Sequence, residues 1–452
     1  MVSARKKIQH LYLRAAFGET PSQVDILASQ PLQSVVDGLF VSSAACKDIN
    51  YLPFPLREDQ ERKGASPFQI LKMVLKSRKD MEELNNEWLF KMTWTKAALR
   101  EKMTFFWHNH FATSVPFAYL MQVQNNTIRR LALGKFPDLL NAIARDPAML
   151  LYLNNQQNRK DHPNENFARE VMELFTLGIG HYSEQDIREA ARAFTGWTVN
   201  TKGEFEFNSN QHDDGEKVFM GKKGNFGGED ILRMLAENRQ TAKFLVAKVY
   251  REFVNPVPDE EKIGHLADYY YDSGYDTSAL MKHIFSSEWF YDDEHIGVKI
   301  ASPVELLVRY KKLIALNFKS EKSQVRLQRA LGQVLFFPPN VAGWKGGTDW
   351  IDSSSLLIRL SIPAYIEQGT MAALRPKPAF ESKGEEASPP GNEVSADWTQ
   401  LASYFQTLQE DLADGQIRDC LLQNDASPGM PFIGSCERKL AQAMSMPEFQ
   451  LI

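Results

Sequence analysis

Residues 164–196 read NENFAREVMELFTLGIGHYSEQDIREAARAFTG, and this stretch decides the fold class. Asn164 is a good N-cap and the glycines near 180 are good stops, which predicts a helix between them. One face of that helix carries apolar residues at three-to-four spacing, namely Phe167, Val171, Leu174 and Phe175. Ser183 then opens a capping box, which predicts a second helix over 184–195.

Helical periodicity continues on both sides of this stretch. Helices are predicted at 10–16, 23–41, 67–78, 80–95, 96–110, 118–133, 136–144, 228–236, 239–253, 259–273, 276–287, 302–317 and 436–445. The pattern changes after Gly196, where Glu204-Phe-Glu-Phe alternates with period two and Lys217-Val-Phe-Met follows the turn signal Asp214-Gly215. The predicted class is therefore mainly α: a large multi-helix globular domain with a small β-hairpin insertion near 197–221, within 197–227.

The domain organisation follows from composition along the chain. Residues 1–374 form the predicted main helical domain, and 54–66 read as a charged loop. Residues 375–397 are rich in Pro, Glu and Ser, which predicts a flexible loop. Residues 398–452 are expected to be C-terminal helices that pack back on the main domain.

Length and charge bound the function only loosely. The chain has 452 residues, with 52 Lys and Arg against 57 Asp and Glu, so its formal charge is -5. This balance argues against nucleic-acid binding, which usually needs a basic surface. No stretch is long and apolar enough to predict a signal peptide or a membrane span, so the expected location is cytoplasmic, or periplasmic if a signal was trimmed. The cysteines form no metal-type pair, and a bond between Cys420 and Cys436 stays open.

The first candidate site is the histidine pair in Phe105-Phe-Trp-His-Asn-His. His108 and His110 are two positions apart, so a regular helix directs them about 200° apart. Joint metal binding therefore needs the helix to end near Asn109. The alternative is that both histidines form hydrogen bonds at a helix end beside the aromatic residues.

The second candidate site is the carboxylate face of the helix over 164–178. Glu165, Arg169 and Glu173 are spaced for ion pairs along one flank. Glu170 and Glu173 on adjacent turns could instead face inward as metal ligands or acid and base groups, with Arg169 beside them. Solvated ion pairs are the alternative.

Two isolated histidines complete the candidates. His181 lies in the connection between two helices that carry carboxylates, where it suits either a ligand or a polar loop residue. His212 precedes Asp213-Asp-Gly, a sequence that favours a tight turn for backbone reasons. The phosphate-loop, dinucleotide-binding, zinc-protease and serine-hydrolase motifs do not occur.

The chain resembles a bacterial family of domains of unknown function, the one numbered eighteen hundred. The resemblance rests on segments in the same order along nearly the whole chain: HLYLRAAFGETPSQV, FWHNHFATS, NENFAREVMELFTLGIGHYSEQDIREAARAFTGW, HDDGEKVFMGKKGNF, SPVELLV, LGQVLFFPPNVAGWKGGTDWID and SMPEFQL. It implies one helical unit and no particular activity. It also implies a partner, because members often accompany a second uncharacterised exported protein.

Two hypotheses follow. In the first, the chain is a metal-dependent enzyme of hydrolase or oxygenase type, with His108, His110, Glu170 and His212 binding zinc, iron or manganese. Glu170, Glu173 and Arg169 would serve the catalytic step. In the second, the chain is a non-catalytic binding or assembly protein, and its His and Glu residues form a structural polar network.

Overall fold

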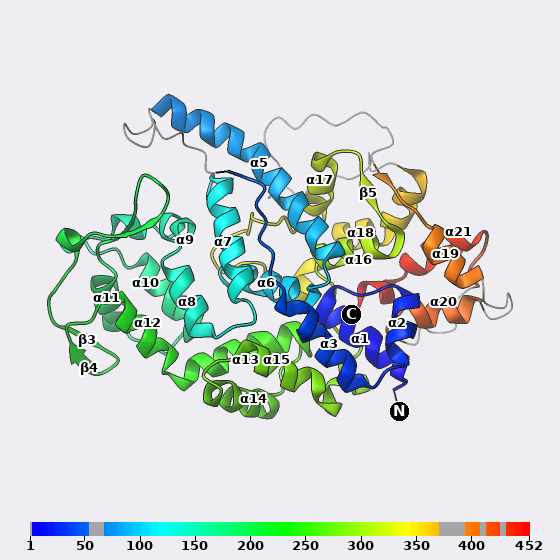
Figure 1. Cartoon of the computed structure of the whole chain (residues 1–452), viewed down its shortest axis with the longest axis horizontal. Helices are drawn as coiled ribbons and strands as arrows, with labels where there is room; N and C mark the ends of the chain where they lie inside the picture. Colours follow the sequence, from blue (N-terminus) through cyan, green and yellow to red (C-terminus); the bar gives the residue numbers. More distant parts are fainter. Residues whose placement is uncertain (1, 54–66, 370–393, 407–412, 425–430) are drawn as a thin grey trace.

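The computed structural model describes residues 2–53, 67–369, 394–406, 413–424 and 431–452 (Figure 1). In these ranges the chain is mainly helical, with small two-stranded antiparallel sheets, as the sequence predicts. No helix within these ranges has both the length and the apolar character that crossing a bilayer requires.

The N-terminal half is a succession of helices around one central helix. Its helices are α1 (Ala4–Ala16), α2 (Pro21–Ala28), α3 (Leu32–Ala44), α5 (Pro67–Trp94), α6 (Ala98–His110), α7 (Ala118–Leu131), α8 (Phe136–Ala144), α9 (Pro147–Tyr152), α10 (Asn166–Glu170) and α11 (Glu184–Ala193). A π-helical segment, Val171–Thr176, continues α10 directly. The predicted break between helices 67–78 and 80–95 is wrong: no Gly or Pro interrupts α5 there, and Lys79 pairs with Glu83 across it at 3.1 Å.

The strands after Gly196 form two hairpins where the sequence predicted one. β1 (Trp197–Val199) pairs with β2 (Phe205–Phe207), and β3 (Lys217–Phe219) pairs with β4 (Lys222–Gly224). Each of the two alternating segments thus pairs with a near neighbour, and the Asp214-Gly215 turn connects the hairpins. A further short sheet joins β5 (Asn317–Phe318) to β6 (Val394–Ser395).

The C-terminal half is helical again. Its helices are α12 (Gly228–Ala236), α13 (Arg239–Phe253), α14 (Glu260–Asp272), α15 (Thr277–Ser286), α16 (Pro303–Ile314), α17 (Glu321–Leu331), α18 (Ser353–Gln368), α19 (Thr399–Gln406), α20 (Ala413–Leu421) and α21 (Cys436–Met444). The predicted loop 54–66 lies outside the described residues, as does most of the predicted loop 375–397.

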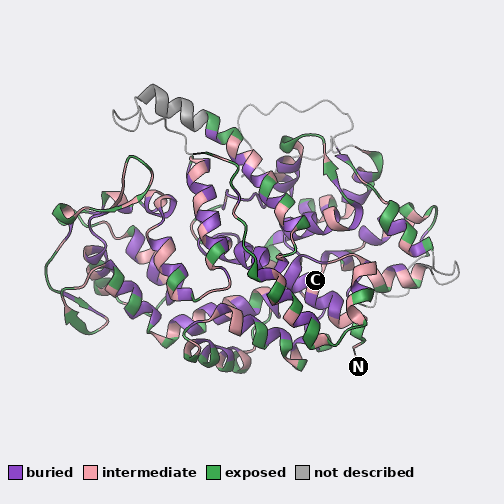
Figure 2. Ribbon diagram, in the orientation of Figure 1, coloured by how far each residue is buried: buried purple, intermediate pink, exposed green. Residues whose placement is uncertain are grey.

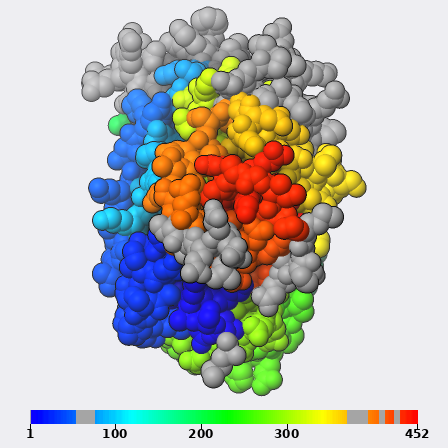
Figure 3. Space-filling model, turned by 90° about the vertical axis from the view of Figure 1, so that its right-hand side faces the viewer, coloured from blue at the N-terminus to red at the C-terminus, as the bar shows by residue number. Residues whose placement is uncertain are grey.

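The two ends of the chain lie side by side. Gln9 on α1 donates to the carbonyl of Cys420 at 2.8 Å, and Figure 3 shows the N-terminal and C-terminal parts adjacent on one face. Cys420 and Cys436 are free thiols, as is Cys46.

Helix α6 lies between two hydrophobic cores. Leu99, Met103 and Trp107 belong to one core, and Phe105 belongs to the other. Every residue from Ala98 to His108 is buried, so α6 has no solvent face (Figure 2). A helix buried on all sides brings its polar residues into the interior as well, and these residues organise the candidate sites.

Candidate functional site

Three consecutive charged residues are buried at the start of α6. Arg100, Glu101 and Lys102 are at most 9% exposed. The Arg100 guanidinium donates to the carbonyls of Ser43 at 2.7 Å and Arg129 at 2.8 Å. Lys102 pairs with the buried Glu305 of α16. Each charge therefore has a partner, which the interior requires.

Glu101 accepts three side-chain hydrogen bonds from two neighbouring helices. Its carboxylate accepts two hydrogen bonds from Arg129, at 2.7 and 3.1 Å, and a third from the Trp88 indole at 2.9 Å. Arg129 in turn donates to the side chains of Asn125 and Asn126. Helices α5, α6 and α7 are thus joined by one buried polar network.

His108 connects α6 to a segment more than two hundred residues away. Its Nε2 accepts a hydrogen bond from the backbone N–H of Phe336 at 3.3 Å. Its ring packs edge-on against Trp88 and Phe336, with centroids 5.0 and 5.2 Å apart. Burial, and secondarily the charge of Arg129, lower the pKa of His108 to about 3, so the ring stays neutral.

His110 points to the other core. Its Nε2–H donates to the carbonyl of Phe175 at 3.2 Å, and its Nδ1 accepts from the Lys248 amine at 3.2 Å. Lys248 also donates to the carbonyl of Leu174 at 3.0 Å. Burial and the nearby Lys248 lower the pKa of His110 well below its usual value. His110 and Lys248 thus donate hydrogen bonds to two backbone carbonyls at the end of the π-helical segment. Carbonyls at a helix end have no N–H partner within the helix.

Asn109, between the histidines, clamps the Gly-rich loop. Its side chain accepts from the backbone N–H of Trp344 at 2.8 Å and donates to the Trp344 carbonyl at 3.1 Å. The preceding Gly343 has φ +75° and approaches so closely that a Cβ there would be 2.3 Å from the Asn109 side-chain oxygen. The three residues His108, Asn109 and His110 therefore hold three different segments against α6.

The carboxylates of the 164–178 stretch take separate partners because the helix changes type. Arg169 pairs with Glu165 at 3.2 Å, as predicted, but its second partner is Glu184 at 2.9 Å. The wider π-helical turn after Glu170 changes the angular spacing of Glu173, which accepts instead from the Tyr182 hydroxyl at 2.5 Å. Glu170 is half-buried, and burial together with the charge of Glu173 raises its pKa.

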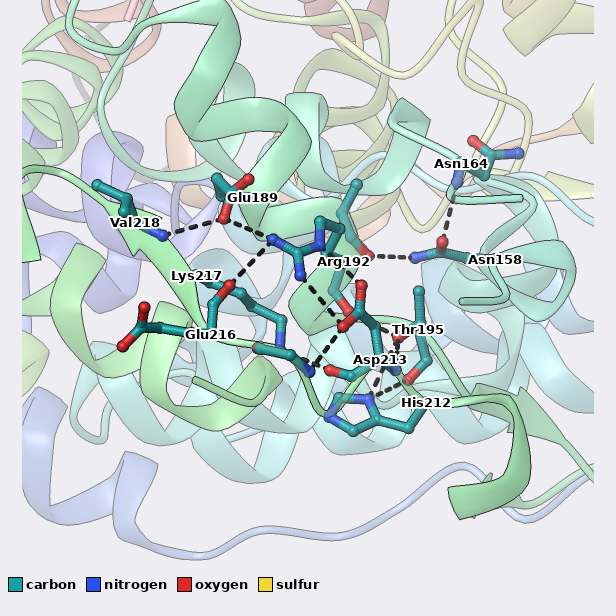
Figure 4. Close-up of polar contacts among 12 residues, drawn as sticks. Asn158, Asn164, Glu189, Arg192, Thr195, His212, Asp213, Glu216, Lys217 and Val218 are labelled. Atoms are coloured by element: carbon teal, nitrogen blue, oxygen red, sulfur yellow. Dashed lines mark hydrogen bonds and ion pairs between the residues drawn. The ribbon is translucent and has the colours of Figure 1, made fainter. Parts of the chain in front are cut away.

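His212 lies in a network that docks the hairpins onto α11 (Figure 4). Its Nδ1–H donates to the Thr195 carbonyl at 2.8 Å. Next to it, Asp213 receives two hydrogen bonds from Arg192, at 2.7 and 3.2 Å. Arg192 also contacts Glu189, whose carboxylate accepts from the Val218 N–H at 2.9 Å. Charged contacts thus bind the connection between the hairpins to one helix.

The candidate metal ligands do not share partners in this arrangement. His108, His110 and His212 each bind a different backbone segment, and Glu170 has none of them as a partner. Within the described ranges, no three His, Cys, Asp or Glu residues are grouped so that they could hold a metal ion. His181 is exposed. The metal site stays a prediction.

The structure also has a cleft that the sequence prediction did not include. Its volume is about 710 Å³, and it lies between the last turns of α5, the segment after α3 and the start of α6. Three aromatic rings stand exposed along it: Tyr51 is 44% exposed, Phe90 63% and Trp94 56%. Lys91, which lies between Phe90 and Trp94 in the sequence, also lines the cleft, as does the buried Glu101.

A sequence signal for this cleft exists in Trp88-Leu-Phe-Lys-Met-Thr-Trp94. Trp88, Leu89 and Met92 are fully buried, and they already fill the core face of α5. Phe90 and Trp94, four positions apart, form a second apolar row on the opposite side. Apolar residues in excess of one helix face indicate a binding surface.

The wall opposite α5 is held by side chains of α7. Asn126 accepts from the N–H of Ile49 at 2.8 Å and donates to its carbonyl at 2.9 Å. Gln122 accepts from the N–H groups of Tyr51 and Leu52. Arg130 binds Asp48 at 2.7 Å. Contacts within the protein therefore hold this wall of the cleft in place.

Comparison with known families identifies the chain. A family model described as "Protein of unknown function (DUF1800)" matches residues 10–451. The chain belongs to this family. No curated protein and no solved structure matches it. The DUF1800 match spans His108, His110, His212, the carboxylate helix and the aromatic cleft, so all of these features lie within the family domain.

Proposed function

We propose that this chain is a binding protein whose cleft between α3, α5 and α6 takes a small organic ligand with a flat apolar face. The observation that carries this proposal is the exposure of Tyr51, Phe90 and Trp94 around one cleft. A ligand that stacks on an exposed aromatic ring removes the apolar face of that ring from water, which favours binding. The volume of about 710 Å³ suits a ligand of roughly drug size.

The contacts of His108 and His110 support binding over catalysis by these two residues. A catalytic histidine needs a free ring nitrogen directed at a substrate. Both ring nitrogens of His110 already form hydrogen bonds within the protein. The second ring nitrogen of His108, Nδ1, belongs to a side chain that is only 1% exposed. In this proposal, these residues and the Glu101–Arg129 pair keep the helices in place beneath the cleft.

The test uses N-phenyl-1-naphthylamine, an uncharged dye that fluoresces in apolar surroundings. We expect saturable binding of one dye per chain. Covering about 60 Å² of one ring contributes about 1.5 kcal/mol, so Phe90→Ala and Trp94→Ala should each raise Kd roughly tenfold. Phe207→Ala is the matched control, because that ring is 49% exposed but lies on β2. Binding that survives both cleft variants, or that the control weakens equally, refutes the proposal.

The metal-dependent enzyme remains the other hypothesis, with zinc, iron or manganese bound by His108, His110, Glu170 and His212. Metal analysis of the purified protein by mass spectrometry tests it, beside the His108→Ala plus His110→Ala variant. A stoichiometric metal that the variant loses would favour the enzyme. The expected protein partner and the compartment, cytoplasm or periplasm, stay predictions.

A further inference from the structure

We infer that the ligand of the aromatic cleft is an anion whose charged group is held by the amine of Lys91. This inference rests on the proposed function, and it adds the chemical class of the ligand. It is carried by the position of Lys91 and by the balance of paired and unpaired charges around the cleft.

Lys91 is half-buried in the cleft, one turn before Thr95. No described residue gives its amine a hydrogen bond or an ion pair, although the amine could donate three. Burial lowers the pKa of Lys91. Glu101 attracts the ammonium group without contacting it. A partly desolvated ammonium group that makes no direct contact is unfavourable, and a bound anion would compensate it.

The carboxylates at the cleft are already neutralised, with one exception. Asp48 is bound by Arg130, and Glu101 by Arg129. Glu87 is the exception, because no described residue pairs with it.

The amines that line the cleft have no ion-pair partner in the part of the chain that the structure describes. Lys47 and Lys96 line it beside Lys91, and neither has a partner among the described residues. Among the described residues that line the cleft, three amines and one carboxylate therefore have no ion-pair partner. This excess of positive charge favours an anion, both in attracting it and in orienting it.

The rings fix where the rest of the ligand lies. Phe90 and Trp94 flank Lys91 in the sequence and line the same cleft. An anion held at Lys91 would therefore have its apolar body against one or both rings. The ligand class is an organic anion with a flat apolar body, such as an aromatic sulfonate or carboxylate.

Two dyes with the same rings separate the charge from the apolar contact. The probe 8-anilinonaphthalene-1-sulfonate carries a sulfonate, whereas N-phenyl-1-naphthylamine has the same rings without it. At low salt we expect the sulfonate to bind at least tenfold more tightly. Lys91→Met should abolish this preference while leaving Kd for the uncharged dye unchanged. Lys91→Arg should keep it, because the positive charge is retained.

The control variant is Lys202→Met, which removes an exposed lysine from the hairpin loop. It should leave the preference intact. Thermal melts of each variant establish that it is folded. A preference that Lys91→Met does not reduce, or equal weakening of both dyes, overturns the inference while the proposed function stands. If Trp94→Ala changes the Kd of neither dye, the proposed function fails and the inference fails with it.

Discussion

Replacing His108 by leucine tests whether this histidine is a structural acceptor. Leucine has a similar volume but cannot accept the hydrogen bond from the buried N–H of Phe336. A buried donor left without a partner costs about 1–3 kcal/mol. We therefore expect His108→Leu to lower the free energy of unfolding by that amount at pH 8.

The effect should shrink in acid. The folded state holds the pKa of His108 at about 3, below the value of about 6.5 in the unfolded chain. A lowered pKa means that the stability contribution is fully present above pH 6.5 and is lost as the pH falls toward 3. Wild type should lose about 2.7 kcal/mol relative to the variant between pH 8 and 4.5, most of it below pH 6.5. The two proteins should therefore be of similar stability near pH 4.5.

Urea unfolding followed by circular dichroism at pH 8, 6.5 and 4.5 measures both quantities. His265→Leu is the control, since that side chain is 80% exposed and its loss should cost less than about 0.5 kcal/mol. The reasoning is refuted if His108→Leu is as stable as wild type at pH 8, or if the gap does not narrow in acid. EDTA that lowers wild type to the level of the variant would assign His108 to a metal instead.

Three further predictions concern other buried or constrained groups. Burial raises the pKa of Asp146 to about 7, so the free energy of unfolding of wild type falls as the pH rises from about 4 to 7. Asn can still cap α9 but does not ionise. Unfolding measured across this pH range should therefore show Asp146→Asn gaining stability relative to wild type as the pH rises. Gly343→Ala should destabilise by several kcal/mol, since its Cβ would clash with Asn109 at a positive φ, and an unchanged melting temperature would contradict the close approach. Titration of unfolded, unreduced protein with Ellman's reagent should find three thiols, because Cys420 and Cys436 are free; one thiol would indicate that they pair.

The helical class and most helix positions could be predicted because they depend on local periodicity and caps. The predicted capping box at Ser183 is present, and α7, α8 and α12 to α15 lie close to their predicted ranges. The π-helical turn at 171–176 could not be predicted from local periodicity. Two of its carbonyls accept hydrogen bonds from His110 and Lys248, which come from distant segments.

The candidate site was harder to predict than the fold. The sequence predicts that a regular helix separates His108 from His110, and α6 does continue to His110. The sequence does not show which residue forms a hydrogen bond with each histidine ring, because Phe336 and Phe175 come from distant segments. The cleft was missed for the same reason. Tyr51 and Trp94 line one cleft only because α3, α5 and α7 pack together.

The buried helix α6 has a consequence for how the protein is made. Lys102 finds its partner 203 positions later and Asn109 finds Trp344 235 positions later. A ribosome adding about 5–20 residues per second needs roughly 10–40 s to supply 200 residues. During that interval, Lys102 and Asn109 have emerged without these partners, whereas Arg100 and Glu101 already have theirs on Ser43 and Arg129. We therefore expect the N-terminal half to fold but to be less stable until the second half of the chain supplies Glu305 and Trp344.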